Sequence, residues 1–333
     1  MITLVATAND YGPTGKLRID DKPIWTQAWG RLSSDTAYIY NSVESPDDKL
    51  LNNADLVVFY LYDRLLTEED MFYDFQHALL QCRCPVIFEW AYILEEASTN
   101  YERMFTHMAP FLNSVNLTMY DFYHEPKHVG LRSHFMPKCE PLWLSNMYFD
   151  RVFWQREIRP HDGERDGRII VLDTTHVTDG LWQHRYWSHK YANDIATLRN
   201  TTFLAHNLPE GAPSPFERHE VMPYLKWPNF VELMLTVSMA VNLDTRPWMG
   251  RAGLDVAAAK IPYLCASDPI VPRKLWKDVA VDDIFDYEST LQRGLDLYDG
   301  KFGAYVDLAH IQLNRMNVDA NKLDIREKLG IDF

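Results

Sequence analysis

Short apolar runs alternate with segments of helical periodicity along most of the chain. In the first half, the continuous apolar run at 54–60 is typical of a buried parallel strand. The helical pattern at 67–81 and the apolar run at 84–90 follow it and complete a strand–helix–strand unit. The same reading predicts strands at 2–7, 37–41, 54–60, 84–90, 116–121 and 133–137, and a further helix at 100–112.

A charged segment at 156–168 interrupts this alternation. It contains proline and glycine and a single aliphatic residue, so it predicts an interdomain linker. The alternation then restarts. We expect strands at 168–173, 202–206, near 221, 239–243 and 261–266, with helices at 188–200, 229–238, 250–260 and 287–300 and a helical period through 301–316.

The alternation predicts the fold class and the domains. Strands that alternate with helices form parallel sheets covered on both faces. At 333 residues the chain suits two domains. We therefore expect an α/β protein with two Rossmann-like domains facing a cleft: 1–160, 161–315 and a C-terminal tail at 316–333.

Charge and cysteine usage narrow the function classes. The net charge of −14 disfavours a general binder of nucleic acid or anionic membranes, although it leaves room for a local basic groove. Only Cys82 and Cys84 of the four cysteines lie close in sequence, which favours reduced thiols over a zinc site. The polar, non-basic start and the lack of an apolar run of about 20 residues predict a cytoplasmic protein without a membrane span.

The segment at 239–267 carries the most chemistry. A strand leads through a loop with Arg246 and Gly250 into a helix that starts near Arg251. The free N–H groups and the dipole of a helix start favour an anion, and arginines add charge-assisted bonds to phosphate. Asp255, about one turn into the helix, can accept both hydroxyls of a ribose. The alternative is an ordinary strand–helix–strand element with surface arginines.

The text "GLDVAAAKIPYLCAS" resembles the donor-binding stretch of GT-B glycosyltransferases, and Asp255 falls where that family has a ribose-binding Glu. The likeness in order and spacing of segments covers most of the chain. It implies a metal-independent glycosyltransferase with no tightly bound cofactor, which moves a sugar from a nucleotide-diphosphate sugar to an acceptor hydroxyl. The lack of an Asp-x-Asp motif agrees with this resemblance.

The chain also departs from the family pattern. Pro247 stands where retaining members often have a first acidic residue, and Lys260 stands where the family usually has Gly. Arg185 and Lys190 have the spacing of the family's Arg and Lys on the donor diphosphate, but they come later after the preceding strand. The alternative for this pair is two solvated charges on a helix start.

The first domain supplies candidates for a catalytic base. Acidic residues follow several of its predicted strands, and we favour Asp10 and Glu89 over their alternative role as caps or turn formers. Gly12 and Gly15 are too close together for a triphosphate-binding loop, and Leu17 follows the lysine. In a GT-B frame they would form a loop facing the cleft.

The acceptor stays open between two classes. One is a small molecule or glycan. The other is a hydroxymethylated pyrimidine in DNA, as in phage enzymes of similar fold class, for which the basic and aromatic segments at 149–159 and 182–191 would suit phosphate and base contacts. A non-catalytic two-domain protein that closes on a ligand is the alternative to an enzyme. The sugar, the nucleobase, the stereochemical outcome and the oligomeric state do not follow from the sequence.

Overall fold

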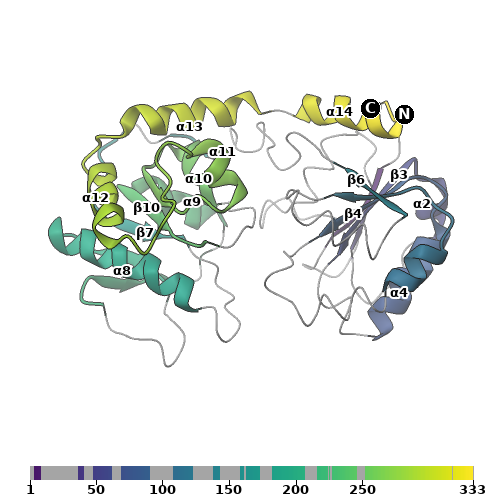
Figure 1. The fold of residues 1–333 in the computed structure, drawn as a ribbon, viewed down its shortest axis with the longest axis horizontal. Coiled ribbons are helices and arrows are strands. Elements are labelled where there is room, and N and C mark those ends of the chain that lie inside the picture. The colour runs from purple at the N-terminus through teal and green to yellow at the C-terminus, as the bar shows by residue number, and fades with distance from the viewer. Residues whose placement is uncertain are drawn as a thin grey trace. The chain divides into compact units, whose positions relative to one another are not determined.

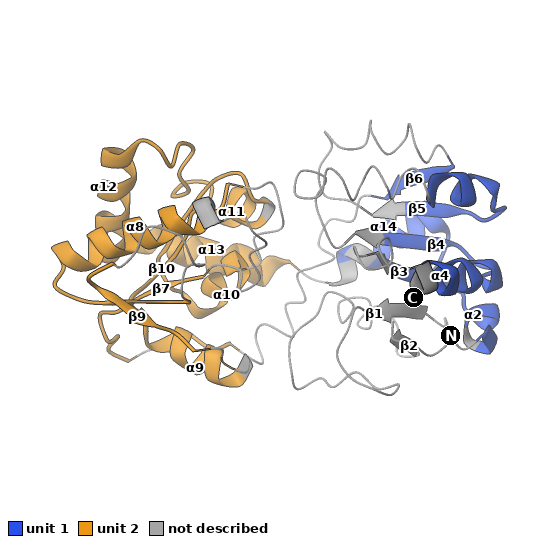
Figure 2. Cartoon of the chain, turned by 90° about the horizontal axis from the view of Figure 1, so that it is seen from below, with its two compact units in different colours: residues 1–150, 317–333 blue, residues 151–316 orange. Residues whose placement is uncertain are grey.

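A computed structural model gives the fold (Figure 1). It describes residues 4–8, 37–40, 48–61, 69–90, 108–122, 138–142, 158–160, 163–172, 182–206, 216–223, 225, 227–245, 252–316 and 318–332. The chain divides into two compact units, which are unit 1 (1–150 and 317–333) and unit 2 (151–316) (Figure 2). Each unit is built on its own parallel sheet.

Unit 1 contains a six-stranded parallel sheet in the order β2-β1-β3-β4-β5-β6. Its strands are β1 (Leu4–Ala8), β2 (Ala37–Tyr40), β3 (Leu56–Leu61), β4 (Val86–Trp90), β5 (Met119–Phe122) and β6 (Cys139–Leu142). Its helices are α2 (Asp48–Asn53), α4 (Glu69–Gln81) and α14 (Val318–Leu329), with a further helical segment at 108–114.

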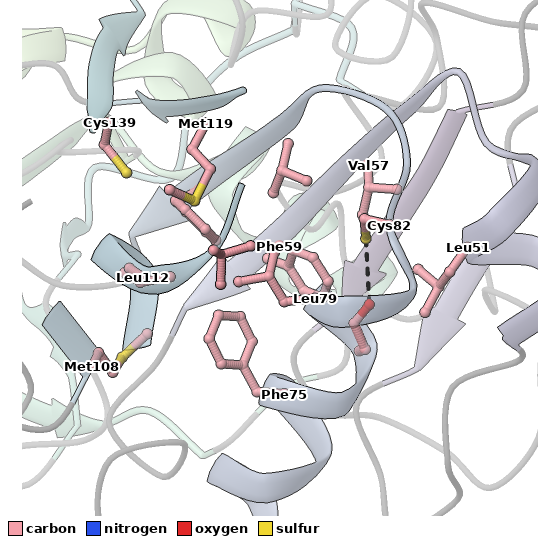
Figure 3. Close-up of a cluster of buried hydrophobic side chains, with 14 of the residues drawn as sticks. Leu51, Val57, Phe59, Phe75, Leu79, Cys82, Met108, Leu112, Met119 and Cys139 are labelled. Atoms are coloured by element: carbon pink, nitrogen blue, oxygen red, sulfur yellow. Dashed lines mark hydrogen bonds between the residues drawn. The ribbon is translucent and has the colours of Figure 1, made fainter. Parts of the chain in front are cut away.

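Alternate residues of the central strands of unit 1 face one cluster of buried side chains (Figure 3). Val57 and Phe59 of β3 lie in it with Phe88 of β4, and Phe59 meets Phe75 of α4 edge to face at 5.2 Å between ring centroids. The intervening residues of these strands are buried as well. Burial on both faces explains why the strands read as continuous apolar runs.

The last helix of the chain belongs to unit 1. The hydroxyl of Tyr120 in β5 donates to the backbone carbonyl of Lys328 in α14 at 3.4 Å. Residues 317–333 therefore belong to the same compact unit as residues 1–150. The boundaries between the two compact units lie at 150/151 and 316/317. The expected domain boundary at 160 and the expected C-terminal tail at 316–333 stay predictions.

Unit 2 contains a five-stranded parallel sheet in the order β11-β10-β7-β8-β9. Helices α8 and α12 cover one face and α9 and α10 the other (Figure 2). The strands are β7 (Ile169–Val171), β8 (Phe203–Ala205), β9 (His219–Val221), β10 (Met239–Asn242) and β11 (Tyr263–Cys265). The helices are α8 (Trp182–Leu198), α9 (Trp227–Thr236), α10 (Ala252–Ala259), α11 (Ile270–Leu275), α12 (Tyr287–Tyr298) and α13 (Gly303–Arg315).

The last strand of unit 1 differs from the prediction. The sequence predicts a strand at 133–137, which lies outside the described residues, whereas the structure places β6 over Cys139–Leu142. The segment "CEPL" contains Pro141, which lacks the N–H that a central strand must donate. A proline is tolerated here because β6 is at the edge of the sheet.

Candidate functional site

Both sheets reverse their strand order once. In unit 1 the chain builds outward from β1 to β2 and then returns to the other side of β1 with β3. In unit 2 it builds from β7 through β8 and β9 and returns beside β7 with β10. Ligands of open parallel sheets bind beyond the carboxyl ends of the strands at such reversal points. The two candidate regions are therefore the ends of β1 and β3, and the ends of β7 and β10.

The unit 1 candidates are only partly described. Strand β1 ends at Ala8, and Asp10, Gly12 and Gly15 follow it outside the described residues. Glu89 lies inside β4, where its backbone pairs with Tyr60 of β3 and Phe122 of β5. It therefore stands within the strand, one residue before the end. Asp10 and Glu89 stay predictions for the catalytic base.

Polar side chains are buried where β10 of unit 2 ends. The strand is buried throughout, yet its last residue is Asn242, and Asp244 follows two positions later with 8% of its surface exposed. The side-chain oxygen of Asn242 accepts a hydrogen bond from the backbone N–H of Asp244 at 3.0 Å. The buried carboxylate of Asp244 therefore lies just after β10, at the point where the strand order reverses.

Helix α10 brings a second buried carboxylate. Asp255 lies in its first turn and is 6% exposed. The predicted helix at 250–260 is confirmed as α10, Ala252–Ala259. The three loop residues predicted to meet a phosphate, Arg246, Gly250 and Arg251, lie outside the described residues. A buried carboxylate at a helix start lies where hydroxyl groups of a ligand would find a strong acceptor.

Tyr263 of β11 reports on the electrostatics of this region. Complete burial raises the pKa of its hydroxyl well above the ordinary value of 10.0, and the nearby charges of Cys265, Asp244 and Asp255 raise it further. The two carboxylates therefore act on one phenol in a region of low polarity. Interactions with a bound cation or hydroxyl are stronger in such a region than in water.

Gly253, in the first turn of α10, has a structural role. A Cβ at this position would lie 2.8 Å from Cγ1 of Val271 in α11. The backbone carbonyl of Gly253 also accepts from Nε1 of Trp276 at 3.0 Å. The missing side chain therefore lets α10 pack closely on the segment that carries α11.

The family departure at Lys260 has a conformational explanation. Lys260 has φ +53°, in the left-handed region that favours glycine. The N–H of Ile261 donates to the carbonyl of Val256 at 2.9 Å, and that of Lys260 to Ala257 at 3.3 Å. These two bonds are the helix-ending pattern that usually contains glycine. The lysine ammonium pairs with Asp307 of α13 at 2.9 Å.

Arg185 and Lys190 both lie on α8, but they have different surroundings. Arg185 is 7% exposed near the start of the helix. Lys190 is half-buried, forms an ion pair with Asp194 and lies over the ring of Tyr287 at 5.0 Å from its centroid. Burial alone would lower the pKa of Lys190, but the Asp194 hydrogen bond raises it. A diphosphate would have to compete with Asp194 for this ammonium, so the role of the pair stays a prediction.

His189 on α8 does not have the surroundings of a metal ligand. Nδ1 of His189 lies 2.8 Å from the carbonyl of Arg185, and Nε2 lies 3.0 Å from that of His206. Within the described ranges, no group of three or more His, Cys, Asp or Glu residues is placed to hold a metal ion. None of the described helices combines the length and apolar character needed to cross a membrane.

Comparisons with known proteins address the fold. No protein-family model and no curated protein sequence matches the chain. Among solved structures, it is similar to an alpha-glucosyltransferase in complex with UDP and a 13-mer DNA containing a HMU base, with 11% identity, a TM-score of 0.66, and coverage of 98% of this chain and 100% of the other.

Two further structures extend this likeness. An alpha-glucosyltransferase in complex with UDP-glucose and DNA containing an abasic site is 10% identical, with a TM-score of 0.65 and coverage of 98% and 100%. The pneumococcal O-GlcNAc transferase GtfA in complex with UDP and GlcNAc is 9% identical, with a TM-score of 0.55, over 85% of this chain and 58% of the other. At these identities the likeness speaks for the fold. The chain has the two-domain Rossmann-like α/β fold of the GT-B glycosyltransferases, as its sequence predicts.

Proposed function

We propose that the protein is a glycosyltransferase that moves a sugar from a nucleotide-diphosphate sugar to an acceptor hydroxyl. The observation that carries the proposal is Asp255, a carboxylate buried in the first turn of α10, directly after the strand that returns to β7. Its place is where a nucleotide ribose would bind in an open parallel sheet.

The proposed roles follow from the places of these residues in the sequence. Asp255 accepts the ribose hydroxyls, and the loop of Arg246, Gly250 and Arg251 binds the diphosphate at the start of α10. Arg185 and Lys190 on α8 neutralise the leaving diphosphate. Asp10 and Glu89 are the candidates for the base that deprotonates the acceptor, and Gly12 and Gly15 allow close approach to the substrates.

Nucleotide binding gives the first test. We expect UDP to raise the melting temperature of the wild type more than other nucleoside diphosphates do, because the solved structures similar to this chain contain UDP. No shift with any uridine, guanosine, adenosine or cytidine diphosphate would refute the proposal. Hydrolysis of a donor sugar in the absence of acceptor separates an enzyme from a passive binding protein.

A substitution tests the residue that carries the proposal. Asp255→Ala should weaken UDP binding about tenfold or more, since hydrogen bonds to a charged group contribute about 1.5–3 kcal/mol. Asp307→Ala is the matched control, because it removes a carboxylate from the same unit that is 60% exposed and paired with Lys260. Equal affinity of wild type and Asp255→Ala would remove Asp255 from the site.

A DNA base is the second candidate for the acceptor. It is favoured by likeness along almost the full length of both chains to an alpha-glucosyltransferase bound to DNA, while the net charge of −14 argues against it. Transfer of labelled sugar to hydroxymethylated DNA, and not to unmodified DNA, would support this acceptor. Transfer only to small saccharides would favour the other class.

A further inference from the structure

The ladder between β7 and β10 stops one rung after the strands end. The strands pair in parallel from Met239 opposite Ile169 to Val241 opposite Val171. The N–H of Leu172 then donates to the carbonyl of Val241 at 2.9 Å. In a continuing parallel ladder, the carbonyl of Leu172 would next accept from the N–H of Leu243. That bond is replaced on both sides.

Two polar side chains take the partners of the missing rung. The side-chain amide of Asn242 donates to the carbonyl of Leu172. The hydroxyl of Ser188 in α8 accepts from the N–H of Leu243 at 2.9 Å. The same Asn242 side chain accepts from the N–H of Asp244. We call Ser188 and Asn242 the exit pair, because they satisfy the backbone where β10 leaves the sheet.

Both side chains of the exit pair are buried. Ser188 is 1% and Asn242 is 7% exposed, and β10 is buried from end to end. A valine or leucine at these positions would suit a buried strand and helix face. Polar groups here need hydrogen bonds to offset the cost of burial, and the bonds to the backbone of Leu172, Leu243 and Asp244 supply them.

We infer that Ser188 and Asn242 are positioning residues, which open the sheet between β7 and β10 and set the direction in which the chain leaves the sheet at Leu243 and Asp244. This inference rests on the proposed function, since the two residues are inferred to position the proposed nucleotide site. Ser188 also fixes α8 to the same backbone, and α8 carries Arg185 one turn earlier. One hydrogen-bonded frame therefore orients both elements that are proposed to meet the nucleotide.

Ser188→Ala, Asn242→Leu and the double variant test this role through UDP titration and thermal unfolding. We expect each single change to weaken UDP binding about tenfold or more, because small displacements of a binding group have large effects. In the double variant the N–H of Leu243 and the carbonyl of Leu172 are free to form the normal rung. Its loss of stability should therefore be smaller than the sum of the single losses, while its affinity for UDP stays low.

Thr290→Val is the matched control. Thr290 is 0% exposed in the same unit, and its hydroxyl donates to the carbonyl of Asp283 at 3.3 Å, so this buried side chain also bonds to the backbone. We expect it to lower the melting temperature and leave UDP affinity within about twofold. A Ser188→Ala variant that loses stability like Thr290→Val and keeps wild-type affinity would overturn the inference.

The wild-type titration keeps the two claims apart. Wild type that binds UDP together with exit-pair variants of equal affinity refutes the positioning role alone. Wild type that binds no nucleotide refutes the proposed function and this inference with it. Affinity that recovers in the double variant along with stability would show that the exit pair acts only on folding.

Discussion

The buried residues of the two units differ in kind. Among the residues that the structure describes, the buried side chains of unit 1 are apolar or cysteine, with the phenol of Tyr120. The described part of unit 2 buries seven polar or charged side chains: Arg185, Ser188, His189, Asn242, Asp244, Asp255 and Thr290. All but Thr290 lie on α8, at the end of β10 or on α10.

This difference separates a scaffold from a site. Apolar burial alone is enough to hold a parallel sheet and its helices together. Polar burial costs free energy unless each group is bonded, so it persists where selection for binding or geometry maintains it. The described core of unit 1 therefore supports the fold, whereas the strand ends of unit 2 combine folding with a proposed ligand site.

The largest expected effect comes from the core of unit 1. Phe88 is 0% exposed and lies 6.3 Å from Phe59 and 6.2 Å from Phe75 between ring centroids. Phe88→Ala should lower the free energy of unfolding by about 3–5 kcal/mol, because it leaves a cavity. Urea unfolding followed by circular dichroism measures the loss. Leu80→Ala, at a residue 61% exposed on α4, is the control and should change stability by less than about 0.5 kcal/mol.

Gly253→Ala tests the packing beneath the site in unit 2. The new methyl group would contact Val271, so we expect a loss of about 1–3 kcal/mol from overpacking. UDP affinity should fall as well, since α10 must shift and Asp255 with it. Val271→Ala in the same background should restore both quantities. Gly303→Ala, where an added Cβ meets nothing within 4 Å, is the control for the loss of a glycine.

Lys260→Gly should strengthen unit 2 without touching the proposed site. Glycine adopts positive φ without the penalty of a side chain, so we expect a gain of about 1 kcal/mol. The lost ion pair with Asp307 offsets little, because both side chains are more than a third exposed. Gly300→Lys is the reverse exchange at the end of α12, where φ is +76° and an added Cβ meets nothing. A gain in the first variant without a loss in the second would contradict this explanation.

The smallest effect concerns pH and unit 1. Burial, followed by the charge of Cys84, raises the pKa of Cys82 from 9.0 to about 12. Burial is also the largest cause that raises the pKa of Cys84, from 9.0 to about 11. The native state thus keeps protons that the unfolded state releases above pH 9.0, so stability falls as pH rises through this window. Replacing both thiols by alanine should flatten the fall in urea midpoint between pH 8 and 10. An unchanged slope would contradict the assignment.

The sequence predicts the elements that rest on apolar pattern. The run at 54–60 and the helix at 287–300 are confirmed as β3 and α12, since buried strands and amphipathic helices have characteristic spacing. The apolar pattern does not predict strand β6, because its two middle residues, Glu140 and Pro141, are exposed. Helix α14 was not predicted, because its charged residues leave no clear apolar stripe.

The candidate site is only partly predictable. Asp255 could be located because a strand, a loop and a helix start surround it in sequence. The exit pair could not be located from the sequence, because Asn242 follows three apolar residues and Ser188 lies inside a helix. Their bonds to Leu172 and Leu243 join segments that are far apart in the sequence. The one sequence signal for this pair is an asparagine at the end of an otherwise apolar strand.

Hydrogen–deuterium exchange with and without UDP tests the contrast between the units most directly. We predict that saturating UDP slows exchange in peptides that cover the end of β10 and the start of α10, residues 239–259, because ordering of a bound loop reduces local opening. Peptides that cover α4 and β4, residues 69–90, should exchange at unchanged rates. Protection centred on 69–90, or no protection in either region, would contradict the assignment of the nucleotide site to unit 2.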